Sequence, residues 1–201
     1  MPTSVDEPIR LEVQADGELS GRTRTYQKAL EDMADVYLDG DAYTDAVGSL
    51  GGGTIVYEVQ EQSYSRDPGA LILGTSKVLP GRIGNEFAMT RGHLHAIADR
   101  AELYLCLSGR GVMLLETIDG ESRAVELIPG QAVNVPGHWI HRSVNVGSEP
   151  FVTLFTYSAD AGQDYGIIAA AGGMKQLIVP DGNEGWTAVP NPRHRGYPAR
   201  A

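Results

Sequence analysis

The sequence holds a single cysteine, Cys106, among its 201 residues, so no disulfide bond can form within the chain. Cations are also few, since 16 Lys and Arg stand against 26 Asp and Glu, which gives a formal net charge of −10. Nucleic acids and anionic membranes are bound through clustered basic side chains, and this composition argues against both partners. No apolar run is long enough to span a bilayer, and the opening "MPTSVDEPIR" lacks the basic and apolar regions of a signal peptide. We therefore expect a cytoplasmic protein.

Glycine and proline, by contrast, are plentiful, with 25 and 11 residues that separate short alternating runs. "TIVYEVQ", "ELYLCLSG", "GVMLLETI" and "FVTLFTY" are four of these runs. Their even spacing predicts an all-β sandwich or barrel of short antiparallel strands. Upstream, Tyr26, Leu30, Met33 and Tyr37 recur at helical spacing within residues 24–37, which predicts a short amphipathic helix.

The organisation along the chain indicates one domain in three parts. Residues 1–52 are expected to form an N-terminal arm and helix, with a turn at Asp16 and Gly17 and a flexible glycine-rich joint at 48–53. Residues 53–180 are expected to form the barrel and carry its site. Residues 181–201 are expected to form a C-terminal strand and a basic tail.

Three of the five histidines and one carboxylate form the most informative pattern. His93 and His95 are two residues apart, so in a strand both side chains project from one face. Glu102 opens the next run, and His141 opens a later one after a Pro-Gly turn. An inward histidine is commonly an ordinary hydrogen-bonded core residue, but a buried carboxylate requires a cation or several donors. Three imidazoles and one carboxylate suit a six-coordinate divalent metal with two positions left for water or substrate.

These stretches resemble the two motifs of the cupin superfamily. The first motif is matched by His93, His95, Glu102 and Gly109, and the second by Gly130, Pro136, His141 and Asn145. The chain departs from the pattern in two places. Six residues separate His95 from Glu102, where cupins have three or four, and His138 stands where a glycine is common. The resemblance implies a cupin fold, a double-stranded β-helix or jelly-roll barrel with a short N-terminal helix and edge strands.

Within the cupins, the segments "TRGHLHAIADRAELYLCLSGRG", "PGHWIHRSVN" and "YSADAGQDYG" closely resemble the glucose-6-phosphate isomerases of archaea and some bacteria, over about residues 11–193. The resemblance implies an enzyme of glycolysis and gluconeogenesis that interconverts glucose 6-phosphate and fructose 6-phosphate. It further implies a homodimer with one divalent metal ion per subunit, Fe²⁺ first and Mn²⁺, Zn²⁺ or Ni²⁺ as alternatives. For the dimer interface we expect edge strands of the N-terminal arm.

The resemblance also assigns roles to individual residues. The expected metal ligands are His93, His95, Glu102 and His141. The expected sugar-phosphate ligands are Ser76, Thr90, Gly92, Tyr157 and Tyr165. Glu102 is the implied catalytic base, with Tyr104 orienting the sugar or the carboxylate, and a family histidine is replaced by Gln163. Proton transfer through a cis-enediolate and a metal-assisted hydride shift both remain open.

Three further polar residues are expected outside the ligand set or have more than one interpretation, and two other functions compete with the isomerase interpretation. Arg91 is either a counter-charge for the phosphate or a solvated surface residue. His138 is expected outside the ligand set, because it stands an odd number of residues from His141 and would face the other side of a strand. His194 is expected at the surface. A cupin non-haem iron oxygenase would use the same four ligands but an apolar pocket. A non-catalytic sugar-binding cupin would be expected to lack one or more of the ligands, all of which are present here.

Overall fold

The computed structural model describes residues 7–63, 65 and 67–199, so the outermost residues of the first and last expected parts lie outside it. The helices are η1 (Leu30–Met33, a 3-10 helix), α1 (Gly40–Leu50) and α2 (Gly166–Ala170). The strands are β1 (Arg24–Ala29), β2 (Ile55–Ser63), β3 (Leu71–Val78), β4 (Arg82–Ile83), β5 (Glu86–Phe87), β6 (Leu94–His95), β7 (Glu102–Ser108), β8 (Gly111–Thr117), β9 (Ser122–Leu127), β10 (Ala132–Val135), β11 (Trp139–Asn145), β12 (Phe151–Ser158), β13 (Gln163–Asp164), β14 (Gln176–Pro180) and β15 (Trp186–Pro190).

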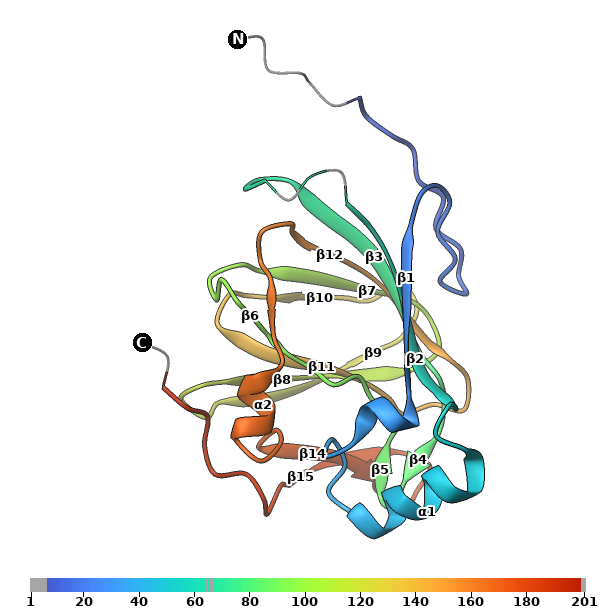
Figure 1. Ribbon diagram of the computed structural model, residues 1–201, viewed down its shortest axis with the longest axis vertical. Coiled ribbons are helices and arrows are strands. Elements are labelled where there is room, and N and C mark those ends of the chain that lie inside the picture. The colour runs from blue at the N-terminus through green and yellow to red at the C-terminus, as the bar shows by residue number, and fades with distance from the viewer. Residues whose placement is uncertain (1–6, 64, 66, 200–201) are drawn as a thin grey trace.

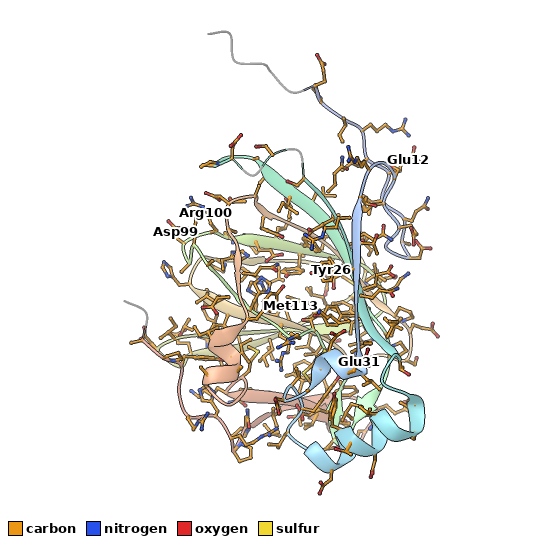
Figure 2. The ribbon with its side chains drawn as sticks, viewed as in Figure 1. Glu12, Tyr26, Glu31, Asp99, Arg100 and Met113 are labelled. Carbon is orange, nitrogen blue, oxygen red and sulfur yellow. The ribbon has the colours of Figure 1, made fainter. Side chains whose placement is uncertain are left out.

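Two antiparallel sheets form the body of the molecule. The larger has the strand order β1-β2-β3-β12-β7-β10, and the smaller has the order β11-β8-β9. They lie as two layers, with the β14–β15 hairpin and the helices at one end (Figure 1). Side chains fill the space between the layers, where Met113 of β8 is fully buried (Figure 2). The predicted all-β fold of the cupin type is confirmed. Near the C-terminus, β14 and β15 pair as antiparallel strands. No helix in the described part of the chain has both the length and the apolar character needed to cross a membrane.

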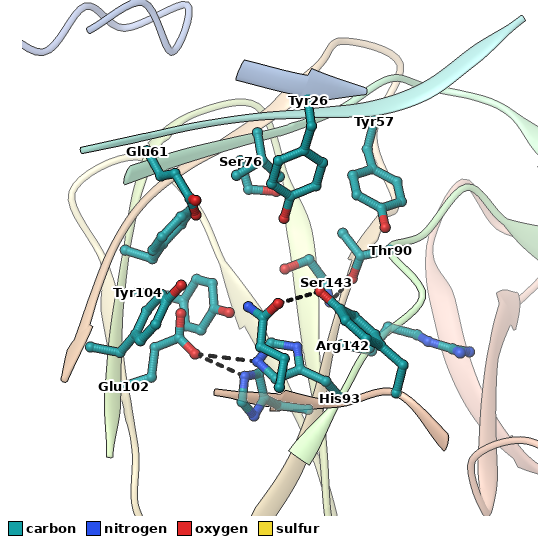
Figure 3. Close-up of a pocket in the computed structure, with 17 residues that line it drawn as sticks. Tyr26, Tyr57, Glu61, Ser76, Thr90, His93, Glu102, Tyr104, Arg142 and Ser143 are labelled. Carbon is teal, nitrogen blue, oxygen red and sulfur yellow. Dashed lines mark hydrogen bonds and ion pairs between the residues drawn. The ribbon is translucent and has the colours of Figure 1, made fainter. Parts of the chain in front are cut away.

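The predicted helix over residues 24–37 is wrong. β1 occupies the first part of this range and pairs with β2, and η1 follows it. Leu30 and Met33 are buried, and their spacing of three residues serves a 3-10 turn as well as an α-helix. Tyr26 instead belongs to the alternation of a strand, and its side chain points inward toward the site described below (Figure 3). The helical spacing was therefore produced by two different elements in succession.

The short N-terminal helix of the expected fold lies further along the chain, as α1, and it includes part of the glycine-rich stretch at 48–53 that was predicted to be flexible. The side chain of Asp39 accepts a hydrogen bond from the Ala42 amide at 2.9 Å, which caps the helix start. Gly51, with a φ of 90°, ends the helix. No residue of α1 is fully buried, and the side that packs against the core consists of partly buried residues: Ala42, Tyr43, Ala46 and Val47.

Asn145 of the second motif joins the end of β11 to two neighbouring segments. Its amide nitrogen donates to the carbonyls of Val78 at 2.8 Å and Glu149 at 2.9 Å, and its oxygen accepts from the Gly147 amide at 2.9 Å. Asn145→Ala leaves these buried groups without partners, so we expect a loss of about 3 kcal/mol in the free energy of unfolding. Urea denaturation measures the loss. The exposed Asn134 provides the control, and equal effects of Asn145→Ala and Asn134→Ala would contradict this role for Asn145.

Candidate metal centre and adjoining pocket

The three histidines and the glutamate reach the space between the sheets from different segments. His93 and His141 are paired through their backbones, with hydrogen bonds of 3.0 and 2.9 Å, so the segment before β6 runs beside β11. His95 lies in β6, and Glu102 is the first residue of β7 in the larger sheet. The site therefore joins the two layers of the barrel.

The side chains converge on the Glu102 carboxylate (Figure 3). Its Oε2 atom lies 3.0 Å from Nε2 of His141, 3.2 Å from Nε2 of His95 and 3.9 Å from Nε2 of His93. The ligand atoms of all four residues lie within 4.8 Å of one another. The side chain of His93 is 12 % exposed, while those of His95, Glu102 and His141 are nearly inaccessible.

Hydrogen bonds on the far side of two rings fix which nitrogen faces the cluster. Nδ1 of His95 lies 2.8 Å from the Arg100 carbonyl, and Nδ1 of His141 lies 3.0 Å from the Trp139 carbonyl. Because a carbonyl oxygen only accepts, both Nδ1 atoms carry a proton. Each Nε2 therefore presents a lone pair to the cluster when its ring is neutral, and donates to Glu102 when its ring is protonated. Nε2 of His93 is buried and has no hydrogen-bond partner among the described residues. Lone pairs that face one another and a carboxylate fit a divalent cation between them.

The electrostatics favour the metal-binding protonation states of Glu102 and His93, whereas the contact with Glu102 favours the protonated form of His95. Burial acts to raise the pKa of Glu102, but hydrogen bonds from His141 and His95 outweigh it and hold this pKa far below its usual range. Burial and the neighbouring His141 lower the pKa of His93. Burial also acts to lower the pKa of His95, but its contact with Glu102 outweighs this and raises it. Glu102 is thus ionised and His93 neutral, as metal ligation requires.

A pocket opens above the cluster. Two cross-strand pairs explain one wall: Tyr157 of β12 lies opposite Glu102, and Phe155 lies opposite Tyr104, so all four side chains share one face. The pocket is lined by all the expected sugar-phosphate residues and by the residue that replaces the family histidine: Ser76, Thr90, Gly92, Tyr157, Tyr165 and Gln163. Of the expected metal ligands, His93, Glu102 and His141 line it as well.

Several lining residues were not identified from the sequence: Tyr26, Tyr57, Val59, Glu61, Arg142, Ser143 and Phe155. Arg142 is the arginine at this pocket, whereas Arg91 does not line it and donates to the Asp32 carbonyl at 3.1 Å. Arg142 follows His141 in β11, so strict alternation would point it away from the site. The alternation of "TIVYEVQ" did contain a usable signal for Tyr57, because it places Tyr57 and Val59 on the same face.

Of the remaining polar candidates, His138 lies where the sequence suggested, and His194 is less exposed than expected. His138 is exposed, with a φ of 70° on the turn before β11, and is not a member of the four-residue cluster. His194 is partly buried, and its Nδ1 lies 2.9 Å from the Gly173 carbonyl. Gln163 accepts a hydrogen bond from the hydroxyl of Tyr165, and both residues line the pocket.

Known proteins place the chain in a family. A family profile described as glucose-6-phosphate isomerase matches residues 27–195. A glucose-6-phosphate isomerase of Sinorhizobium medicae is 45% identical over 94% of this chain and 88% of its own length. One from Thermococcus litoralis is 39% identical over 88% of this chain and 92% of its own length. Among solved structures, an oxalate oxidase aligns over 54% of each chain with 17% identity and a TM-score of 0.45. By sequence, the chain belongs to the glucose-6-phosphate isomerase family.

Proposed function

We propose that the protein interconverts glucose 6-phosphate and fructose 6-phosphate with the help of one divalent metal ion per subunit. The observation that carries the proposal is the buried cluster of three histidines and Glu102 at the base of a pocket lined by hydroxyl groups. Membership of the isomerase family agrees with it.

His93, His95, Glu102 and His141 are the proposed ligands of the metal. Three imidazoles and one carboxylate suit Fe²⁺ first, with Mn²⁺, Zn²⁺ or Ni²⁺ as alternatives. A divalent cation bound there supplies a Lewis acid that stabilises negative charge on the sugar oxygens. The orphaned Nε2 of His93 and the inward Nε2 atoms of His95 and His141 support this assignment.

Ser76, Thr90 and Gly92 are the proposed phosphate ligands. The hydroxyl of Ser76 is buried and has no partner within the described residues, so it is available to a ligand. Thr90 Oγ1 is fixed by the Ser143 amide, which donates to it at 3.1 Å. Gly92 has a φ of 72°, and a Cβ atom there would lie 2.9 Å from the His141 carbonyl. Only glycine fits this turn without strain, and it leaves the backbone open to an oxyanion.

Glu102 is the proposed base that moves a proton between C1 and C2 of the open-chain sugar. Tyr104 lies two residues along β7, and burial raises its pKa well above the usual value, with the charge of Glu102 adding to the effect. Tyr104 therefore keeps its proton and can donate to a sugar oxygen. Tyr157, on the same wall as Glu102 and Tyr104, and Tyr165 are proposed to hold the rest of the chain of the sugar.

We further propose a cytoplasmic homodimer. β1 is an end strand of the six-stranded sheet, and an end strand presents unpaired backbone groups to a second copy. The pocket composition also weighs against the oxygenase alternative, since the lining includes eight side chains with a hydroxyl group: Tyr26, Tyr57, Ser76, Thr90, Tyr104, Ser143, Tyr157 and Tyr165.

Removing the metal is expected to abolish the reaction. The protein is treated with a chelator and then given one divalent metal at a time, and turnover of fructose 6-phosphate is coupled to a glucose-6-phosphate dehydrogenase. Turnover should vanish after chelation and return with one or more of the four named metals. Untreated protein is the reference. If no metal restores turnover to protein that is still folded, the proposed function is wrong.

A further inference from the structure

A second cleft adjoins the sugar pocket and is larger than it. It is bounded by the turn after η1, by α2 and by the C-terminal tail, which lie together at one side of the barrel (Figure 1). Arg142 and Tyr165 line both cavities. The guanidinium of Arg142 extends away from the histidine cluster (Figure 3). The residue therefore stands between the two spaces.

Four arginines line this cleft on a protein with a net charge of −10: Arg91, Arg142, Arg193 and Arg195. Asp35 is the acidic residue among the lining residues. Within residues 7–63, 65 and 67–199, no carboxylate lies within 4.0 Å of any of the four guanidinium groups. So much local positive charge without an ion pair is unusual on an acidic protein.

The hydrogen bonds of these arginines go to neutral acceptors. Arg142 donates to the Arg91 carbonyl at 2.7 Å and to the sulfur of Met89 at 3.0 Å. The other three each donate to a backbone carbonyl, that of Asp32, Tyr37 or Ala170. These contacts hold the guanidinium groups in place but leave their charges without a counter-charge in direct contact.

Among the four arginines, Arg142 is the one for which the missing counter-charge is most costly. It is only 4% exposed, and its Nε–H has no acceptor in the part of the chain that the structure describes. A buried cation with an unsatisfied donor is costly unless an anion approaches it. Glu86 acts on Arg142 and Arg193 from a greater distance, but burial raises the pKa of Glu86, which favours its neutral form.

The tail that carries Arg193 and Arg195 is anchored in advance. The amide of Arg195 donates to the Ala171 carbonyl at 2.8 Å. The side chain of Asn191 donates to the Met174 carbonyl at 2.7 Å and accepts from the Arg193 amide at 2.9 Å. Gly172 makes room, since a Cβ atom there would lie 2.3 Å from the Arg193 carbonyl. The two cations therefore face the cleft without further ordering of the chain, which lowers the entropic cost of binding.

We propose that this four-arginine cleft binds a small oxyanion with two or more negative charges, at a site separate from the sugar pocket. Phosphate esters and di- or tricarboxylates have this chemistry, and guanidinium groups pair with such groups through two parallel hydrogen bonds. The site goes beyond the isomerase reaction, which requires a single sugar phosphate beside the metal.

Calorimetric titration of the metal-loaded protein with inorganic phosphate tests the proposal. A sugar-pocket variant, Ser76→Ala with Thr90→Val, lacks the hydroxyl groups proposed to hold phosphate in the sugar pocket and is titrated in parallel with the wild type. We expect one phosphate to bind per subunit of this variant, and sodium chloride at equal ionic strength not to replace it. Loss of all phosphate binding in the sugar-pocket variant would assign the phosphate to the sugar pocket and overturn the proposal.

Variants locate the site. Arg193→Gln together with Arg195→Gln should weaken phosphate binding by about tenfold or more, because each removes a charge-assisted hydrogen bond. Arg22→Gln together with Arg123→Gln is the matched control, since both residues are exposed and the change in charge is the same. Should the double variant fail to fold, the single change at exposed Arg195 carries the test with a weakening of about fivefold. Unchanged affinity in the arginine variants would overturn the proposal.

Discussion

His141→Ala is expected to reduce kcat for fructose 6-phosphate by about a thousandfold or more, because loss of a metal ligand removes several kcal/mol of charge stabilisation from the transition state. His141 is 2% exposed and lies 3.0 Å from Glu102, and the Trp139 carbonyl fixes its ring. Alanine therefore leaves a gap in the cluster that no neighbouring side chain fills. The coupled assay gives kcat, and elemental analysis of the purified variant should show reduced metal content.

The control for this change lies three residues earlier. His138→Ala removes an imidazole from the same stretch of sequence, but His138 is exposed and outside the cluster. We expect its kcat and metal content to stay within about twofold of the wild type, as is usual for surface substitutions. Similar losses in His138→Ala and His141→Ala would mean that the second motif supplies a different ligand.

The sequence was most informative where the chemistry of the side chains and their alternation along a strand indicate the same site. His93, His95, Glu102 and His141 were identified because imidazoles and a carboxylate at these offsets are rare, and the structure brings these four residues together. The local structure behind them was less predictable. β6 contains only two residues, and His93 is held by a single backbone pairing with His141. This pairing joins residues nearly fifty positions apart, so no local pattern reveals it.

Errors arose where tertiary contacts override local periodicity. Tyr26 fits a helical repeat with Leu30, yet pairing with β2 draws it into a strand. α1 was not predicted, because its own sequence pattern is weak. Its caps, Asp39 and Gly51, are visible in the sequence, but its apolar side is short and only partly buried: Ala42, Tyr43, Ala46 and Val47.

Arg142 shows a different limit. It neighbours a proposed metal ligand in the strand, so alternation directs it away from the sugar pocket, and nothing in the sequence pairs it with Arg193 or Arg195. The C-terminal tail brings those residues to it by folding back over α2, where the Arg195 amide bonds to the Ala171 carbonyl. The second cleft was therefore beyond the reach of sequence patterns.

Glu102→Gln is expected to lower kcat by about a thousandfold even when metal is supplied in excess, since loss of a catalytic base commonly costs 10² to 10⁴ in rate. Glutamine keeps the size and the acceptor oxygen but loses the charge and the basicity. In deuterated water, the wild type should incorporate deuterium at the carbon that exchanges its proton, and the variant should not. The coupled assay and mass spectrometry of the sugar phosphates give the two measurements.

Glu116→Gln is the matched control, because Glu116 is also a fully buried carboxylate but does not line the pocket. It accepts from the amides of Lys175 and Gln176 at 2.7 and 2.9 Å, so its substitution should reduce stability and leave kcat nearly unchanged in the folded protein.

The hydrogen bonds of His141 and His95 keep the pKa of Glu102 low, and a carboxylate with a low pKa is a weak base. The comparison therefore has a second informative result. A metal-loaded Glu102→Gln variant that retains turnover would restrict Glu102 to metal binding, and a wild type that isomerises without deuterium uptake would favour transfer of hydrogen directly between the two carbons.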